Sequence, residues 1–139
     1  MSTISNKPIL LVEDDKIDQM TVKRALRDIS VANELIIKEN GEDALEYLRD
    51  TTNAKPCIIL LDLNMPRMNG IEFLQVAKND DYLRSIPTVV LTTSQEDQDR
   101  LNSFHFGVAG YMIKPVDYQQ FVETMKTIKL YWTISQLPD

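Results

Sequence analysis

Histidine and cysteine are scarce in this chain of 139 residues, which contains one of each. A single cysteine, Cys57, excludes an intramolecular disulfide and any cysteine-based zinc cluster. A single histidine, His105, likewise excludes a metal site built from several histidines. Any metal site in this chain therefore has to rely on oxygen ligands.

Positive charge and long apolar runs are also in short supply. The chain has 15 basic and 21 acidic residues, for a net charge of −6, which argues against broad binding to a nucleic-acid backbone. No apolar run approaches the roughly 18 residues of a membrane span, and the N-terminal MSTISNKP lacks the apolar core of a signal peptide. A cytoplasmic protein without nucleic-acid or membrane partners is expected.

The sequence contains five short apolar runs. Each is continuous rather than alternating, which is typical of strands buried on both faces of a parallel sheet. Helix-like segments separate them, so the order is strand then helix, five times. This order predicts an α/β fold with helices on both faces of a parallel sheet, in one domain over residues 1–139, with a core of about 7–128 and a helical tail at 129–139. The predicted strands are 9–12, 35–37, 57–61, 88–91 and 111–113.

The helical segments show apolar residues at a period of three to four. The first, residues 16–29, has a stripe from Met20 to Ile29, and Asp15 is its expected N-cap. A later helix is expected to extend past His105 to Val108, which makes His105 a surface or partly buried helical residue. The last helix is expected to begin after an N-cap at Asp117 and to include Trp132.

Polar side chains follow all five predicted strands. Because ligands of open parallel sheets bind beyond the carboxyl ends of the strands, these side chains are expected to meet. Lys38, Glu39 and Asn40, after the second strand, are interpreted as ordinary solvated residues. The candidates for the site are Glu13, Asp14 and Asp15 after the first strand, Asp62 after the third, Thr92, Thr93 and Ser94 after the fourth, and Lys114 after the fifth.

Glu13, Asp14 and Asp62 together would repel one another unless a cation joins them. Lys114 supplies only one positive charge, so a hard divalent ion such as Mg²⁺ would complete the balance. Simpler interpretations exist for each residue taken alone. An acid after the first strand can cap a helix, and Asp62 can begin a turn. Thr92 can end a strand, and Lys114 can be a solvated loop residue. Alternatively, Asp62 can act as a nucleophile that forms an acyl phosphate.

Four longer motifs contain these candidates, in the order ILLVEDD (9–15), CIILLDLNMP (57–66), TVVLTTS (88–94) and GYMIKP (110–115). With these motifs, the chain resembles the receiver domain of two-component response regulators. Thr92 and Lys114 lie 30 and 52 residues after Asp62, close to the usual intervals of the family. The resemblance implies the flavodoxin-like (βα)5 fold, a three-layer sandwich with a five-stranded parallel sheet of order 2-1-3-4-5.

The same resemblance implies a role for each site residue. Asp62 would be the phosphoacceptor, and Lys114 would contact the phosphoryl group. Thr92 and Tyr111 would be the switch residues. Mg²⁺ would be held by Asp14, by Asp62, by the backbone carbonyl of Asn64, and by Glu13 through water.

The implied activity is that of a stand-alone response regulator, not a dedicated enzyme. A sensor histidine kinase or a phosphotransfer protein would donate the phosphoryl group. The TTS run at 92–94, the loop at 50–56 and the tail TIKLYWTISQLP (127–138) resemble single-domain regulators paired with bacterial phytochromes or hybrid sensor kinases. A homodimer is expected either through the fourth helix, fifth strand and fifth helix or through the aromatic tail at Tyr131 and Trp132.

Three rival interpretations make different demands on the sequence. An aspartate-dependent phosphatase needs a second Asp two residues after the nucleophile, where this chain has Asn64. A flavodoxin needs hydroxyl- and glycine-rich phosphate contacts after the first strand, where Glu13, Asp14 and Asp15 would repel a phosphate. A receiver-like domain that is never phosphorylated would not need Asp14, Asp62, Thr92 and Lys114 together.

Overall fold

The computed structural model describes residues 7–65, 67–92, 95–103, 105–113 and 117–135, with the backbone alone at 92, 95, 113 and 128–135. A five-stranded sheet forms the middle layer, and its order is β2-β1-β3-β4-β5 with every neighbouring pair parallel. This confirms the predicted topology. The strands are β1 (Ile9–Val12), β2 (Leu35–Lys38), β3 (Ile58–Asp62), β4 (Thr88–Thr92) and β5 (Gly110–Ile113).

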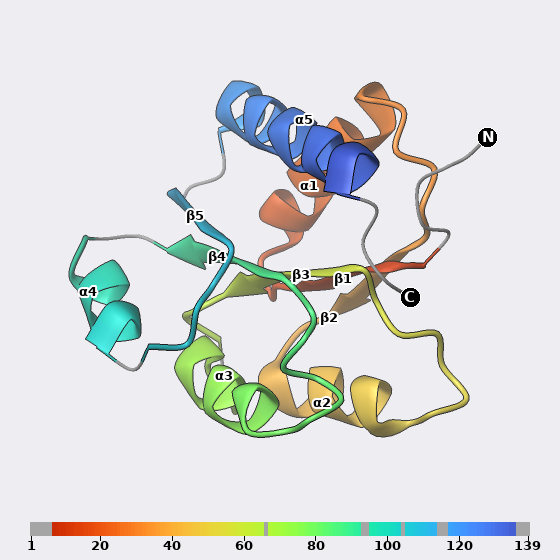
Figure 1. Cartoon of the computed structure of the whole chain (residues 1–139). Helices are drawn as coiled ribbons and strands as arrows, with labels where there is room; N and C mark the ends of the chain where they lie inside the picture. Colours follow the sequence, from red (N-terminus) through yellow and green to blue (C-terminus); the bar gives the residue numbers. More distant parts are fainter. Residues whose placement is uncertain (1–6, 66, 93–94, 104, 114–116, 136–139) are drawn as a thin grey trace.

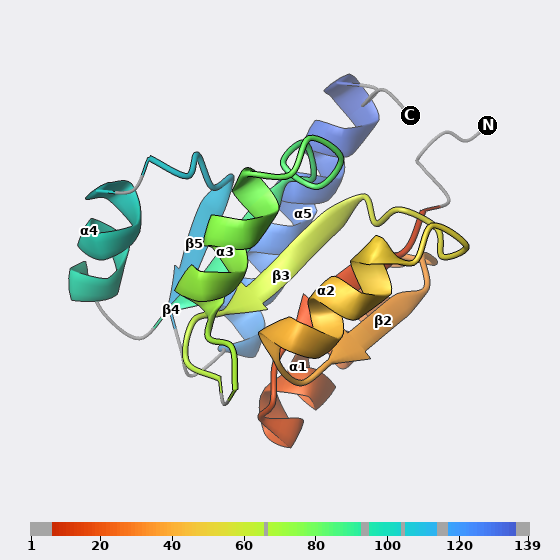
Figure 2. The ribbon, with the colours of Figure 1, turned by 90° about the horizontal axis from the view of Figure 1, so that it is seen from below.

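Helices cover both faces of the sheet, as Figures 1 and 2 show. In Figure 1, α1 and α5 lie above the sheet and α2 and α3 lie below it, while α4 stands at the end of the sheet near β4 and β5. The predicted three-layer, flavodoxin-like arrangement is therefore confirmed. The helices are α1 (Lys16–Asp28), α2 (Gly41–Arg49), α3 (Gly70–Lys78), α4 (Gln95–Ser103) and α5 (Tyr118–Ser135).

The strands are apolar because each of their faces packs against a helical layer. In β1, Ile9 and Leu11 join the apolar cluster under α1 and α5, whereas Leu10 and Val12 join the cluster on the side of α2 and α3. The same alternation holds in β3. Two fully buried aromatic rings anchor the two clusters, Phe121 on the α1/α5 side and Phe73 on the other.

Capping residues begin two of the helices, α1 and α5, where the sequence indicates. The Asp15 side chain accepts hydrogen bonds from the backbone N–H groups of Ile17 and Asp18, at 2.8 and 3.1 Å. Asp117 accepts one from the N–H of Gln120 at 2.9 Å. Both predicted N-caps are confirmed, and each one satisfies backbone donors that the first turn leaves without a helical partner.

Three local predictions are wrong. The side chain of Met20 is 70% exposed, because the buried face of α1 contains Asp18, Gln19, Val22, Ala25 and Leu26. Asn40 is buried rather than solvated, and its side chain caps α2 by accepting a hydrogen bond from the N–H of Asp43. His105 lies after α4, not in it: the helix ends at Ser103, and His105 takes a left-handed φ of 56° that closes the helix end.

Cys57 offers a test of the packing at the start of β3. Burial raises the pKa of its thiol to about 11. The folded protein thus keeps this proton at a pH where an unfolded thiol, with a pKa of about 8.5, has lost it. We expect the stability of the fold to fall as the pH rises from about 8.5 to about 11.

Urea denaturation at several pH values in this window measures that loss. Because other groups also titrate there, the comparison is with Cys57→Ala, which removes the thiol and should flatten part of the decline. An identical decline in both proteins would contradict the expectation.

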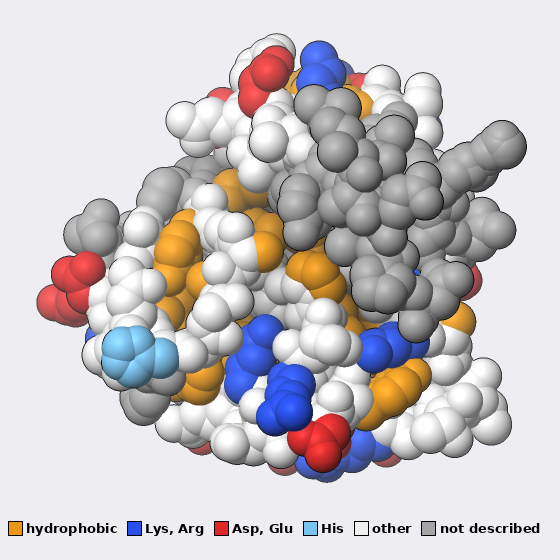
Figure 3. Space-filling model, in the orientation of Figure 1, with side chains coloured by type: hydrophobic (Ala, Val, Ile, Leu, Met, Phe, Trp, Pro, Cys, Tyr) orange, Lys and Arg blue, Asp and Glu red, His pale blue; other side chains and the backbone are white. Residues whose placement is uncertain are grey.

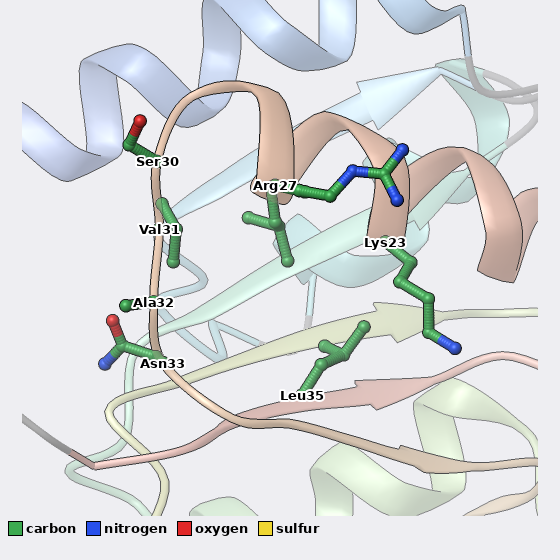
Figure 4. A pocket seen from close by; sticks show the side chains of 8 residues that line it. Lys23, Arg27, Ser30, Val31, Ala32, Asn33 and Leu35 are labelled. Atoms are coloured by element: carbon green, nitrogen blue, oxygen red, sulfur yellow. The ribbon is translucent and has the colours of Figure 1, made fainter.

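A shallow pocket of about 420 Å³ lies between α1 and β2. It is lined by side chains from the last turns of α1, the loop that follows and the first residue of β2, and Figure 4 shows them around the opening. β2 begins here, so the pocket belongs to the amino edge of the sheet. The candidate site residues follow the opposite, carboxyl edge.

No helix within the described part of the chain combines the length and the apolar character needed to cross a membrane.

Candidate functional site

The register of the sheet brings two acidic residues next to each other. β1 and β3 pair in parallel, with Val12 opposite Leu61. One residue further along both strands, Glu13 comes opposite Asp62. Because parallel strands end at the same edge, residues 49 positions apart in the sequence become neighbours there.

Asp14 completes an acidic cluster with these two residues. Each of Glu13, Asp14 and Asp62 offers a carboxylate oxygen, and these oxygens all lie within 4.8 Å of one another. Glu13 and Asp62 are buried, with 0% and 1% of their surface exposed, whereas Asp14 is exposed. The predicted convergence of the three carboxylates is therefore what the structure shows.

Electrostatic repulsion among the three carboxylates opposes this arrangement. Two like charges 4.8 Å apart repel by about 3 kcal/mol when the effective dielectric constant is about 20. The donor set is made of carboxylate oxygens, partly buried and open on the side of Asp14. This is the chemistry that a hard divalent cation selects.

Backbone hydrogen bonds fix the orientation of the two buried acids. The N–H of Asp15 donates to Oε2 of Glu13 at 3.1 Å, and the N–H of Asn64 donates to Oδ1 of Asp62 at 3.1 Å. The side chain of Gln19 donates to the backbone carbonyl of Glu13 at 2.6 Å, which ties α1 to the end of β1. The carboxylates are held by the same turns that begin the loops after β1 and β3.

Gly70 allows the loop after β3 to close tightly under Asp62. A Cβ at this position would lie 2.7 Å from the carbonyl oxygen of Asp62 and 2.7 Å from the Cα of Leu63. The N–H of Gly70 also donates to the carbonyl of Leu63 at 3.0 Å. Since both obstacles are backbone, they cannot rotate away, and only glycine permits α3 to begin here.

The remaining predicted site residues lie on the neighbouring strands or outside the described residues. The Asn64 side chain is exposed in the loop after β3. Thr92 ends β4, one residue beyond Leu91, which pairs with Asp62. Tyr111 lies in β5 opposite Val90, and its hydroxyl donates to Oδ1 of Asn102 in α4 at 2.6 Å. Lys114, like Thr93 and Ser94, lies outside the described residues.

Sequence reasoning missed several residues that shape this edge of the sheet. Gln19, which holds the carbonyl of Glu13, also donates to Glu39 at 3.3 Å, and Lys16 forms an ion pair with Glu39. These contacts link α1 to the end of β2. The sequence offers no clear signal for Gln19, because it lies outside the predicted apolar stripe of α1.

Basic side chains gather on one face of the molecule. Although the net charge is −6, Figure 3 shows Lys and Arg side chains gathered over the lower part of the face in view, beside hydrophobic ones.

Comparison with known proteins agrees with this geometry. The family model of the response regulator receiver domain matches residues 9–126, which include the acidic cluster and all five strands. The chain belongs to this receiver domain family. Its members are signalling regulators of two-component systems rather than dedicated enzymes.

Several relatives are similar over most of their length. The response regulator Rcp1 of Synechocystis is 36% identical over 138 residues, which are 95% of this chain and 94% of Rcp1. The solved Mn²⁺-bound form of Rcp1 has a TM-score of 0.80 with 35% identity, covering 96% of this chain and 99% of that one. The bacteriophytochrome response regulator RtBRR has a TM-score of 0.80 with 42% identity, covering 96% of this chain and 84% of that one.

A phosphorylated relative is also known. The phosphorylated cyanobacterial phytochrome response regulator RcpA has a TM-score of 0.79 with 36% identity, covering 96% of this receiver and 98% of that chain. The predicted similarity to regulators associated with phytochromes is confirmed at the level of family relatives.

Proposed function

We propose that this receiver accepts a phosphoryl group on Asp62 from a phosphohistidine of a sensor kinase or phosphotransfer protein. The observation that carries the proposal is the cluster of Glu13, Asp14 and Asp62 at the carboxyl edge of the sheet. Membership of the receiver family and similarity to a phosphorylated relative support it.

The acidic cluster fits a divalent cation, and we assign it to Mg²⁺. Asp14, Asp62 and the backbone carbonyl of Asn64 would hold the ion directly, and Glu13 would hold it through water. The Mn²⁺-bound form of Rcp1 supports a divalent ion in a protein of this family. When bound, such an ion supplies positive charge to the oxygens of a transferring phosphoryl group.

Asp62 acts as the nucleophile in the proposed transfer. One of its carboxylate oxygens forms a bond to phosphorus while the bond between phosphorus and the donor's histidine nitrogen breaks, and the nitrogen keeps the electron pair. The hydrogen bond from the N–H of Asn64 holds the Asp62 side chain at its Oδ1. Lys114 would stabilise the negative charge with its ammonium group.

Thr92 and Tyr111 would convert phosphorylation into a change of surface. The Thr92 hydroxyl would donate a hydrogen bond to the new phosphoryl group, and Tyr111 would turn inward into the space that Thr92 leaves. Thr92 ends β4 and Tyr111 lies in the neighbouring strand β5, so the two residues belong to adjacent strands. The phosphoryl group would thereby favour one of two packings of α4, β5 and α5.

Partner binding is the proposed output of this change. A homodimer through α4, β5 and α5 or through the C-terminal tail stays a prediction, and the side chains of Tyr131 and Trp132 lie outside the described residues. The division into a core of about 7–128 and a tail of 129–139, the absence of nucleic-acid and membrane partners, and a cytoplasmic location also stay predictions.

The proposal is tested by incubating the protein with acetyl phosphate and Mg²⁺ and then measuring its intact mass. We expect wild type to gain one phosphoryl group and Asp62→Asn to gain none, because an amide is not a nucleophile for phosphorus. A chelator should prevent the gain in wild type.

Asp43→Asn is the matched control, since Asp43 lies in the first turn of α2 and is not one of the three clustered acids. It should be phosphorylated as wild type is. A gain of one phosphoryl group by the Asp62→Asn protein would contradict the assignment of Asp62 as the acceptor. No mass gain in wild type, with acetyl phosphate shown to be intact, would contradict the proposed function.

A further inference from the structure

The hydroxyl of Tyr111 is already engaged in this structure. It donates a 2.6 Å hydrogen bond to Oδ1 of Asn102, a residue in the last turn of α4. The Tyr111 ring is half-buried and packs against the apolar cluster on the α2/α3 side of the sheet. The polar end of the ring therefore ties β5 to α4, while the ring itself contacts the core.

The backbone geometry fixes both ends of the bond. Tyr111 is opposite Val90 in the β4–β5 ladder, and Val90 belongs to the same apolar cluster as Leu101 of α4. Leu101 is 1% exposed and anchors the helix next to Asn102. The backbone carbonyl of Asn102 accepts a 3.1 Å hydrogen bond from the N–H of His105, whose left-handed conformation closes the end of the helix.

We propose that Asn102 is a positioning residue that holds Tyr111 in its present orientation before phosphorylation. We call this orientation outward, because the hydroxyl lies on Asn102 at the exposed side of the molecule. This inference rests on the proposed function, because it concerns the residue that would turn when Asp62 is modified. Two opposing interactions then determine the orientation of the Tyr111 ring. Asn102 favours the outward ring in the resting protein, and the phosphoryl group and Thr92 favour the inward ring.

The strength of the Asn102–Tyr111 contact sets how much it biases the resting state. Turning the ring inward removes the hydroxyl from Oδ1 of Asn102, and both groups are on the exposed side of the molecule, where water replaces the bond. A net hydrogen bond of this kind corresponds to roughly a 2- to 10-fold change in the ratio of the two orientations. Removing it should raise the affinity for a phosphoryl mimic by the same factor.

A double-mutant cycle measures this bias. Asn102→Ala, Tyr111→Phe and the double variant are titrated with beryllofluoride at saturating Mg²⁺, and binding is followed by amide chemical shifts in NMR. Asn102→Ala should bind beryllofluoride roughly 2- to 10-fold more tightly than wild type. In a Tyr111→Phe background the same substitution should have no further effect, because the hydroxyl is already absent.

Asn102→Asp is the matched control for the helix itself. It changes the same position but keeps a side-chain oxygen that accepts the hydrogen bond. Its affinity for beryllofluoride should not exceed that of wild type. If Asn102→Ala acted only by loosening α4, its effect on the affinity would persist in the Tyr111→Phe background. Keeping a side-chain acceptor in Asn102→Asp would then not restore the affinity of wild type.

A second measurement needs neither metal nor phosphoryl mimic. In protein labelled with ¹³C on the tyrosine rings, the Tyr111 signal is assigned by its loss in Tyr111→Phe. In resting Asn102→Ala this signal should move toward its position in beryllofluoride-bound wild type, and in Asn102→Asp it should stay at the resting position.

The outcomes separate the role of Asn102 from the function of the receiver. An unchanged affinity and an unmoved Tyr111 signal in Asn102→Ala, while wild type binds beryllofluoride, would overturn the role of Asn102 and leave the proposed function standing. If wild type itself neither binds beryllofluoride nor gains a phosphoryl group, the proposed function fails, and the inference fails with it.

Discussion

Asp62→Asn is expected to be more stable than wild type when divalent ions are removed, by about 1–3 kcal/mol. Asp62 is 1% exposed, and its carboxylate lies in a cluster whose three oxygens are within 4.8 Å of one another. Neutralising one of the three clustered charges relieves its repulsion with the other two. The clustered charges favour the binding of a cation, and they lower the stability of the protein when no ion is bound.

The substitution preserves the local geometry. Asn has the shape of Asp, and its Oδ1 can still accept the hydrogen bond that the N–H of Asn64 donates at 3.1 Å. Only the charge and one acceptor oxygen change. A rise in stability can therefore be assigned to electrostatics rather than to repacking.

The difference in stability between the two proteins should shrink, and reverse where it is smallest, when Mg²⁺ is added. A ligand at 100 times its dissociation constant stabilises the folded state by about 2.7 kcal/mol. Wild type should gain this amount, and Asp62→Asn should gain much less because it has lost a proposed ligand. Urea denaturation of both proteins, with a chelator and with saturating Mg²⁺, measures the four free energies of unfolding.

Asp81→Asn is the control for charge alone, because the Asp81 side chain is 91% exposed and is not one of the three clustered acids. Its stability should stay close to that of wild type in both conditions. If Asp62→Asn were less stable than wild type in the chelator, the idea that repulsion dominates the empty site would be wrong.

Phe121→Ala is expected to lower the free energy of unfolding by about 3–5 kcal/mol. Phe121 is 0% exposed and belongs to the apolar cluster between the sheet and the helices α1 and α5. Removing the ring deletes apolar burial and leaves a cavity that the rigid sheet on one side cannot fill. Because domains of this kind are stable by only about 5–15 kcal/mol, the variant should be close to unfolding at physiological temperature.

Tyr82→Ala provides the comparison, since Tyr82 is 45% exposed and the ammonium of Lys55 lies over its ring at 4.4 Å from the centroid. Its loss should change the stability by no more than about 1 kcal/mol. Urea denaturation followed by far-UV circular dichroism measures both variants. A cost for Phe121→Ala no larger than that for Tyr82→Ala would contradict the placement of Phe121 in the core.

Much of the fold could be predicted because its local signals are strong. Unbroken apolar runs such as Ile9–Val12, and the one that leads into Asp62, mark strands buried on both faces. Asp15 and Asp117 mark helix starts, since a side-chain acceptor at that position satisfies the first backbone donors. The acidic cluster could be predicted from the strand order, because the residues that follow parallel strands lie at the same edge of the sheet.

Other features depend on which face of an element the rest of the chain covers. The predicted stripe of α1 is buried at Val22, Ala25 and Leu26, yet Met20 is exposed and the polar Gln19 is buried. Asn40 has the polar neighbours of a solvated loop residue, but it is buried as the cap of α2. Burial is a property of the assembled layers, and periodicity in one segment does not specify its rotation.

By itself, then, the sequence determined the strand and helix order, the caps at Asp15 and Asp117 and the identity of the acids, because these depend on neighbours along the chain. Tertiary structure alone decided that Gly70 lies against the carbonyl of Asp62 and that Tyr111 reaches Asn102. These contacts join separate elements, and their distances are fixed only when the sheet and its two helical layers have packed together.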